Sequence, residues 1–413
     1  MKMQTVQRVS IELVFVALFL GLSPIYWLPL LPFSLLLTIK VMLLGVVVFY
    51  PFLRFKDGVY ALPKFITPLL GFSVALAIPS AIAHLSFDFI GLFAILFLVA
   101  IGYTLSCCYG TERALNSLFM AVVVFSLIAM LVVIDFAAGG IFINPMHSVR
   151  LYLYQTGLHG GRTGWTAICN VFLAISLFGL IVSKPGLTRG ALITSSVVLL
   201  LNLVVVDSRG GLITGVFVLS IYLLHLAANS RVKAFFLLMV FWLGGVLIAA
   251  EFGERLISSR TYLSIFAPEE LRSGVTTGRT DGFWVAIRLY VESPLIGVGE
   301  INLKDYGQDV EKVHNVWLRT LAEQGFLGFL SLLVFSLGLF AAVFKRTALP
   351  RSAIYMVLAA GLVPSLFEPT GVFGNYFATA PFWITVGLLL APADYDSLQR
   401  SASLMGSNRY ERC

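Results

Sequence analysis

Long apolar stretches separated by short polar loops run along almost the whole chain. A helix needs about 20 apolar residues to cross the roughly 30 Å of hydrocarbon in a bilayer. The repeated stretches therefore predict an all-α integral membrane protein with about twelve transmembrane helices. We expect these helices near residues 10–25, 31–50, 64–84, 87–108, 114–138, 163–183, 189–206, 211–228, 234–252, 314–344, 352–367 and 372–391.

One long polar interval, residues 252–313, interrupts this pattern. It divides the chain into transmembrane helices one to nine (1–251), a large loop (252–313), helices ten to twelve (314–391) and a polar tail (392–413). Because the polar side chains gather in this one interval, we expect the chemistry of the protein there.

Composition supports a membrane protein. Hydrophobic residues make up 59% of the chain and charged residues 12%, whereas soluble domains carry about 25% charged residues. The formal net charge of +7 comes from Lys and Arg spread over short loops, without the basic stripe and interleaved aromatics of a nucleic-acid surface. We therefore expect membrane lipids and no nucleic acid as partners. The first apolar run, 9–22, lacks the small-residue cleavage site of a removable signal peptide, so we expect it to stay as a span.

The basic residues divide unevenly between the two sides of the predicted bundle. With the N-terminus inside, the short loops on its side hold eleven Lys and Arg residues, whereas those on the other side hold Arg150, Arg162 and Arg209. Since basic loops stay in the cytoplasm, both termini are predicted to be cytoplasmic. The loop 252–313 is then on the outer face, which in a Gram-negative bacterium is the periplasm.

The sequence contains no recognisable spacing of metal ligands. Cys107 and Cys108 are adjacent and the remaining cysteines are isolated, so neither a disulfide framework nor a zinc spacing exists. Four histidines form no metal spacing either and are interpreted as polar anchors, namely His84, His147, His159 and His225. The carboxylate pair Asp394 and Asp396 is interpreted as solvated charge in the tail. Lys40 lies in mid-span, where an ionisable group is a functional hypothesis by default.

Two arginines are candidates for binding an anion. Arg209 is wedged between two spans with almost no loop, where a guanidinium pairs with an anion, snorkels to the interface or pairs with Asp207. Arg279 opens a predicted amphipathic helix with Trp284, Ile287, Arg288 and Val291, and an arginine beside the free N–H groups of a helix start suits phosphate oxygens. The alternative for Arg279 is an exposed loop arginine.

His314 is the candidate base. It precedes Trp317, Leu318 and Leu321 at helical spacing and is placed at the outer membrane edge, where the dipole of a helix start favours the neutral imidazole. The alternative is an interfacial polar anchor. Apolar runs and loop charges alone place Arg209, Arg279 and His314 on one face of the membrane. The segment Ser293–Gly299, which lies between Arg279 and His314 in the sequence, is predicted to be a rigid structural turn.

Four segments occur together in a recognisable order. They are SRGG (208–211), GRTDGFW (278–284), ESPLIGVG (292–299) and HNVWLRTLAEQGFLG (314–328). In this order, within about twelve spans, they resemble the O-antigen ligase and polymerase family. The resemblance covers roughly residues 200–345, and the first half of the chain matches in hydropathy alone.

The resemblance implies an inner-membrane glycosyltransferase of the GT-C type that works without metal or other cofactor. Such a ligase transfers a polysaccharide en bloc from undecaprenyl diphosphate to lipid A-core oligosaccharide and completes lipopolysaccharide. Arg209 and Arg279 would bind the diphosphate, and His314 would activate the acceptor hydroxyl for attack with inversion. Arg162, which faces the same side, would add a third positive contact.

Three other functions stay open. An O-antigen polymerase would use the same donor with a lipid-linked acceptor, and its pattern of Arg, ten residues, then Gly occurs here at Arg150 with Gly161 and at Arg288 with Gly299. The single large external loop favours the ligase. A protein O-oligosaccharyltransferase is a third option. A transporter would place ionisable residues near the membrane midplane, where only Lys40 clearly lies.

Overall fold

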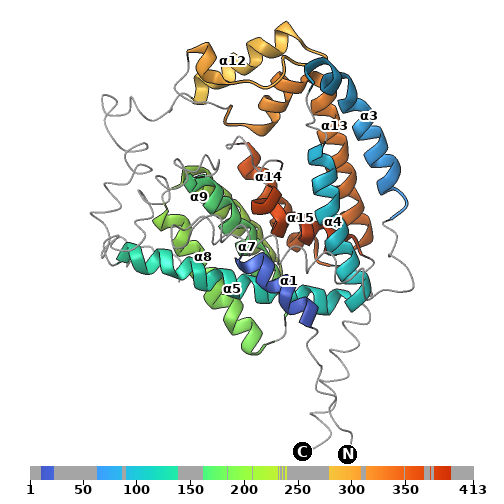
Figure 1. Ribbon diagram of the computed structural model, residues 1–413. Coiled ribbons are helices and arrows are strands. Elements are labelled where there is room, and N and C mark those ends of the chain that lie inside the picture. The colour runs from blue at the N-terminus through green and yellow to red at the C-terminus, as the bar shows by residue number, and fades with distance from the viewer. Residues whose placement is uncertain are drawn as a thin grey trace, which may run out of the picture.

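A computed structural model describes residues 11–22, 63–85, 90–137, 161–183, 185–206, 208–230, 279–307, 313–347, 349–366 and 376–391, with positions 232, 235, 238, 239 and 373. These residues form α-helices joined by short connections and one 3-10 turn (Figure 1). The elements are α1 (Ile11–Leu22), α3 (Ile66–His84), α4 (Ile90–Tyr109), α5 (Thr111–Ala137), α7 (Gly161–Val182), α8 (Leu187–Val205), α9 (Arg209–Asn229), α12 (Arg279–Glu292), η3 (Leu303–Tyr306), α13 (Val316–Arg346), α14 (Arg351–Ser365) and α15 (Tyr376–Leu390).

Ten of the predicted spans coincide with helices of the structure to within a few residues, namely α1, α3, α4, α5, α7, α8, α9, α13, α14 and α15. By length and composition, six of them could cross a membrane: α3, α5, α7, α8, α9 and α13. These helices indicate an integral membrane protein. The spans expected near 31–50 and 234–252 lie outside the described residues, apart from three positions of the second, so the total of about twelve stays a prediction.

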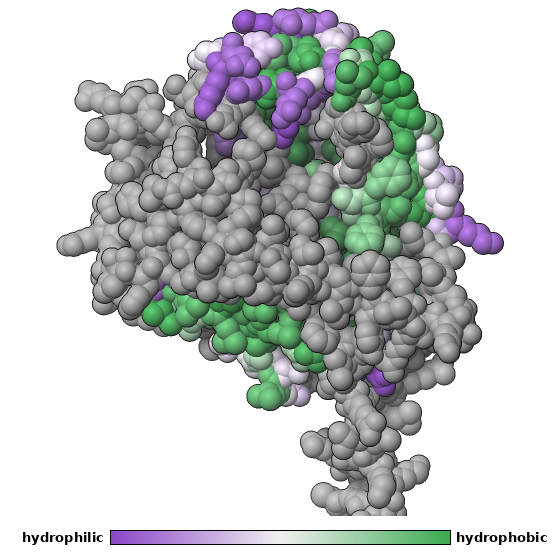
Figure 2. All heavy atoms as spheres, in the orientation of Figure 1, coloured by the Kyte–Doolittle hydropathy of each residue, from purple (hydrophilic) through white to green (hydrophobic). Residues whose placement is uncertain are grey.

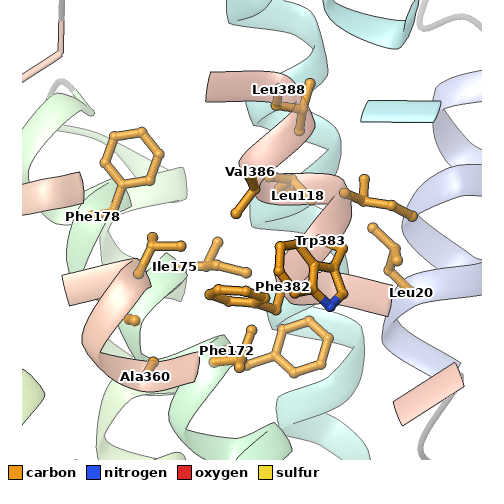
Figure 3. Close-up of a cluster of buried hydrophobic side chains, with 14 of the residues drawn as sticks. Leu20, Leu118, Phe172, Ile175, Phe178, Ala360, Phe382, Trp383, Val386 and Leu388 are labelled. Carbon is orange, nitrogen blue, oxygen red and sulfur yellow. The ribbon is translucent and has the colours of Figure 1, made fainter. Parts of the chain in front are cut away.

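The main hydrophobic core surrounds α7, whose window Gly164–Val182 is 83% buried. Phe172 and Ile175 of α7 lie beside Phe382 of α15 in this core (Figure 3). Lipid tails are as apolar as these side chains, so helices in a membrane associate through close packing rather than through removal of water. The dense aromatic layer around α7 provides that packing.

A second, smaller apolar cluster joins α12 to the first part of α13. It contains Ala286 and Leu289 of α12, Ile301 and Leu303 of the connection, and Ala322 of α13. In Figure 1 these two segments lie at the top of the view, above α9 and α14. Hydrophilic side chains gather over them in Figure 2, whereas apolar side chains cover α3 at the right. The predicted loop 252–313 thus contains a small folded layer at one end of the helix bundle.

Candidate active site

The N-terminal ends of α7 and α9 lie against each other. A Cβ on Gly211 would collide with the side chain of Thr166, and the Asn170 side-chain amide donates to the Gly211 carbonyl oxygen at 2.9 Å. Arg162 is one helical turn before Thr166, and Arg209 is the first residue of α9. The structure therefore brings the backbones of both predicted arginines to the same end of neighbouring helices.

Local sequence explains why α9 begins at Arg209. Ser208 is the N-cap residue in extended conformation, and its hydroxyl accepts a hydrogen bond from the Gly211 N–H at 3.3 Å. A serine in this position satisfies one of the free N–H groups at a helix start. The SRGG segment thus combines a cap, a cation and a glycine that allows close approach to α7.

His314 lies just outside α13 rather than on its first turn. The helix begins at Val316, because Asn315 is the N-cap and its side-chain oxygen accepts from the N–H groups of Trp317 and Leu318 at 2.9 and 3.0 Å. The predicted span began two residues earlier. His314 is half-buried and its Nδ1 atom is fully covered, so its imidazole sits beside the positive end of α13.

Contacts at the opposite end of the bundle fix the direction of these helices. His225, near the end of α9, lies 2.8 Å from the hydroxyl of Ser352, near the start of α14. Because only residues 347–350 separate α13 from α14, the C-terminal ends of α9 and α13 share one end of the bundle. The N-terminal ends of α7 and α9, with Arg162 and Arg209, therefore lie toward the other end of the bundle. The break at Gly325, where the first part of α13 with His314 before it separates from the rest of that helix, also lies toward this other end.

Arg279 is the first residue of α12, as the sequence predicted. Gly282, Ala286 and Leu289 form the buried face of this helix. The predicted stripe of Trp284, Ile287, Arg288 and Val291 lies on the exposed side instead. The buried face thus carries two small residues, and the sequence pattern of large apolar residues did not identify it.

The turn after α12 is the structural element that its Pro and Gly residues predicted. Its backbone pairs with a break in α13: Val298 and Gly299 donate to the carbonyls of Ala322 and Glu323 at 3.0 and 2.9 Å. Gly325, with φ 68°, interrupts the helix at this point. The turn therefore fixes the first part of α13, and with it the position of His314.

α3 supports the same turn from the side. The Ser80 hydroxyl donates to the Ile296 carbonyl at 2.8 Å, and His84 Nε2 lies 3.2 and 3.0 Å from the carbonyl oxygens of Ile296 and Gly297. His84 was interpreted as a polar anchor at the membrane edge. The structure assigns it the more specific task of capping two carbonyl groups of the turn.

Sequence reasoning missed one polar pair in this region. Arg319 and Glu323 form an ion pair at 2.9 Å in the first part of α13. Oppositely charged residues at i and i+4 face each other on a helix, so their spacing could have revealed the pair. Two opposite charges four residues apart in an otherwise apolar span were the sequence signal for this ion pair.

Several predicted residues lie outside what the structure describes. They include Lys40, His147, Arg150, His159, Asp394 and Asp396. For Arg162, Arg209 and Arg279 the structure describes the helix position but not the side chain. Among the described residues, no three His, Cys, Asp or Glu side chains gather into a group that could hold a metal ion.

Comparison with known proteins agrees with the motif order. A search of the curated proteins finds no match. A family model described as O-antigen ligase matches residues 194–333, a range that contains Arg209, Arg279 and His314 and ends within α13. Residues 194–333 are therefore similar to the O-antigen ligase family.

Proposed function

We propose that this protein is an O-antigen ligase of the GT-C type in the inner membrane, with its active site on the periplasmic face. The family indicates a membrane glycosyltransferase-like enzyme of lipopolysaccharide or polysaccharide biosynthesis that acts on lipid-linked polysaccharides. Our proposal specifies the reaction: a polysaccharide on undecaprenyl diphosphate is transferred en bloc to lipid A-core oligosaccharide.

One observation carries this proposal. The N-terminal ends of α7 and α9 lie against each other, and the first part of α13, with α12 packed on it, lies at the same end of the bundle. Each of these N-terminal ends carries a partial positive charge and free N–H groups. Arg162, Arg209 and Arg279 add full positive charges in the first turns of α7, α9 and α12. Helix starts that each carry an arginine suit the binding of a diphosphate.

The proposed reaction assigns each group a role. The acceptor hydroxyl oxygen attacks the anomeric carbon, the bond from that carbon to the diphosphate oxygen breaks, and its electron pair leaves with the diphosphate. Arg209 and Arg279 stabilise the negative charge that develops on this leaving group. His314 takes the proton of the acceptor hydroxyl. Since Nδ1 is covered, we assign this proton to Nε2.

The polymerase alternative relied partly on the spacing of Arg288 and Gly299. Gly299 has another explanation, because its φ is 86° and a Cβ there would lie 3.2 Å from the His84 ring. The backbone of the turn thus requires a glycine whatever the acceptor is. This supports the ligase as the first choice.

Reconstitution of the purified protein tests the proposal. The protein is placed in lipid vesicles with an undecaprenyl-diphosphate-linked glycan, with and without lipid A-core, and the products are resolved by mass. We expect glycan joined to lipid A-core, formed only with that acceptor and lost in His314→Ala. Longer lipid-linked glycan without the acceptor would instead make the protein a polymerase.

A further inference from the structure

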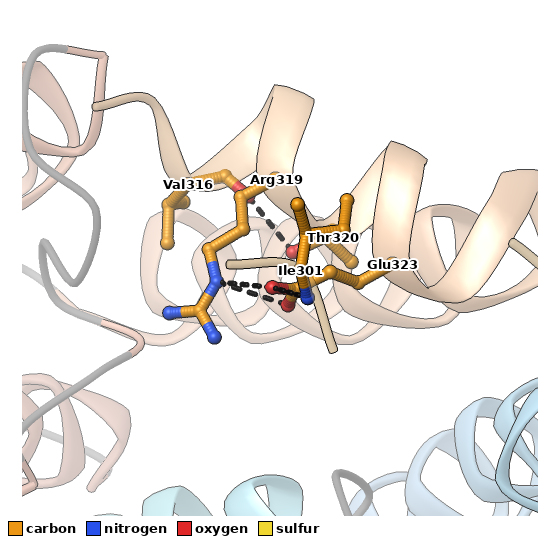
Figure 4. A network of polar contacts seen from close by, with 5 residues as sticks. All are labelled: Ile301, Val316, Arg319, Thr320 and Glu323. Carbon is orange, nitrogen blue, oxygen red and sulfur yellow. Dashed lines mark hydrogen bonds and ion pairs between the residues drawn. The ribbon is translucent and has the colours of Figure 1, made fainter. Parts of the chain in front are cut away.

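A buried carboxylate anchors Arg319. Glu323 is 7% exposed, and both of its oxygens accept from Arg319 Nε at 2.9 Å. One of these oxygens also accepts from the Ile301 N–H at 3.2 Å (Figure 4). A buried carboxylate that loses its cation is strongly destabilising. The pair therefore ties α13 to the connection that follows α12 and holds the arginine in one orientation.

The pairing uses a small part of the hydrogen-bonding capacity of Arg319. A guanidinium carries five N–H donors, and Glu323 takes one of them, at Nε. The two terminal amino groups point away from the carboxylate (Figure 4). Within the described part of the chain, the Arg319 side chain makes no other hydrogen bond. The pairing with Glu323 thus leaves the two terminal amino groups for another partner. Their planar arrangement suits two parallel hydrogen bonds to a phosphate or a carboxylate.

Arg319 also occupies a particular place between the two apolar clusters. Val316 and Trp317 pack against the main core, whereas Leu318 and Ala322 pack against the α12 cluster. Arg319 leaves α13 at the boundary between these faces, five residues after His314, and its side chain is 21% exposed. Part of the Arg319 side chain is thus accessible from outside the fold.

We propose that Arg319 is a phosphate-binding residue of the active site, with Glu323 as the residue that positions it. The terminal amino groups would donate two parallel hydrogen bonds to the non-bridging oxygens of one phosphate group. That phosphate belongs either to the donor diphosphate or to the acceptor saccharide, which share this chemistry. The inference rests on the proposed glycan transfer and adds a residue that the ordered motifs did not indicate.

Substitution by lysine separates binding from a merely structural ion pair. In Arg319→Lys the single ammonium group pairs with Glu323, so the fold is kept, but no second set of donors remains for a phosphate. Arg319→Gln removes the charge as well. The matched control is Arg351→Gln. Arg351 is an exposed arginine at the start of α14, next to the C-terminal end of α13, whereas Arg319 lies near the N-terminal end of α13.

Steady-state kinetics in vesicles, with donor and acceptor varied separately, is the first measurement. We expect Arg319→Lys to keep a melting temperature near that of the wild type while kcat/KM falls about tenfold or more, the scale of a charge-assisted hydrogen bond. A rise in KM for the donor alone assigns the phosphate to the diphosphate. A rise for the acceptor alone, lost when a dephosphorylated acceptor is used, assigns it to the acceptor.

Two results would overturn the inference. One is wild-type KM values for both substrates in Arg319→Lys. The other is an Arg319→Gln variant that still folds and keeps full kcat/KM. Glu323→Gln adds an independent check, because the amide can still accept from Ile301 N–H but presents a second donor to Arg319 Nε. It should raise the same KM as Arg319→Lys.

The test also works if the proposed function fails. Should the wild-type protein transfer no glycan, calorimetry with inorganic pyrophosphate still measures anion binding by the purified full-length chain. We expect wild type and Arg351→Gln to bind it equally and Arg319→Lys to bind it at least about tenfold more weakly. Equal binding by all three proteins would remove Arg319 from any anion site.

Discussion

Gly297 and Gly325 lie backbone against backbone where the turn after α12 meets the break in α13. A Cβ on Gly325 would come within 2.5 Å of the Gly297 nitrogen, and a Cβ on Gly297 would collide with the Glu323 carbonyl. Both residues also have positive φ, 75° and 68°. Neither position has room for a side chain, so this contact sets the angle at which the first part of α13, with His314 before it, leaves the membrane helix.

Substituting either glycine should destabilise the protein. Alanine in Gly297→Ala or Gly325→Ala adds a Cβ to a closed contact, at a cost of about 1–3 kcal/mol for overpacking, and forces an L-residue into the left-handed region for about 1 kcal/mol more. We expect a clearly lower melting temperature in detergent and a loss of transfer activity. The measurement is thermal unfolding of the purified variants.

Gly307→Ala is the control for backbone conformation alone. Gly307 has φ 73°, but a Cβ there meets nothing within 4 Å. This variant should therefore lose about 1 kcal/mol and keep its activity. If all three substitutions had equal effects, the contact between the turn and α13 would not be what requires the glycines.

The contact between Gly211 and Thr166 gives a second prediction. Gly211→Ala should push α9 away from α7, lower stability and reduce transfer, since both helices carry a proposed diphosphate-binding arginine. The double variant Gly211→Ala with Thr166→Gly restores the space and should recover much of both properties. Gly190→Ala, a helix position on α8 with nothing within 4 Å, should be neutral or slightly stabilising. Failure of the double variant to recover would mean that helix separation is not the cause.

Apolar runs predicted the helices well because burial in lipid imposes a strong length requirement. They could not predict the break at Gly325, because a broken helix and a continuous one have the same hydropathy. The sequence placed Arg279 at a helix start through Gly278, which is a local signal. It placed Arg209 in the short connection before the span 211–228, whereas α9 begins at Arg209 itself, after the N-cap Ser208. Contacts such as His84 with the Ile296 carbonyl join segments 212 residues apart, and no local pattern encodes such a pairing.

The same limit explains the face of α12. Trp284, Ile287 and Val291 have helical spacing, yet they are exposed. The opposite face, with Gly282 and Ala286, is buried instead, and a Cβ on Gly282 would lie 2.9 Å from the Leu303 side chain. Periodicity shows that a helix has two faces. Which face is buried depends on the partner surface, and here that surface is built from η3 and α13.

Metal independence can be tested directly. The proposed mechanism uses arginine side chains to neutralise the leaving diphosphate, so adding a chelator to the reconstituted protein should leave the rate unchanged. The assay compares initial rates with and without excess chelator, followed by addition of magnesium or manganese. Strong inhibition that either ion reverses would contradict the proposal that the arginines alone stabilise the diphosphate.

The sharpest test of the proposed site compares Arg279 with His314. Arg279→Ala should lower kcat/KM by about two to three orders of magnitude, as expected for the loss of a group that stabilises developing charge. His314→Ala should lower kcat by about two to four orders of magnitude through loss of the base. Both variants should express and unfold like the wild type.

Arg279→Lys should also be impaired if the arginine makes two parallel hydrogen bonds to the phosphate. Full activity of this variant would show that a positive charge alone suffices. Arg288→Ala is the matched control, because this arginine lies exposed on the same helix and has no role in the proposed mechanism. Loss of activity in Arg288→Ala together with wild-type activity in Arg279→Ala would move the site to the other face of α12.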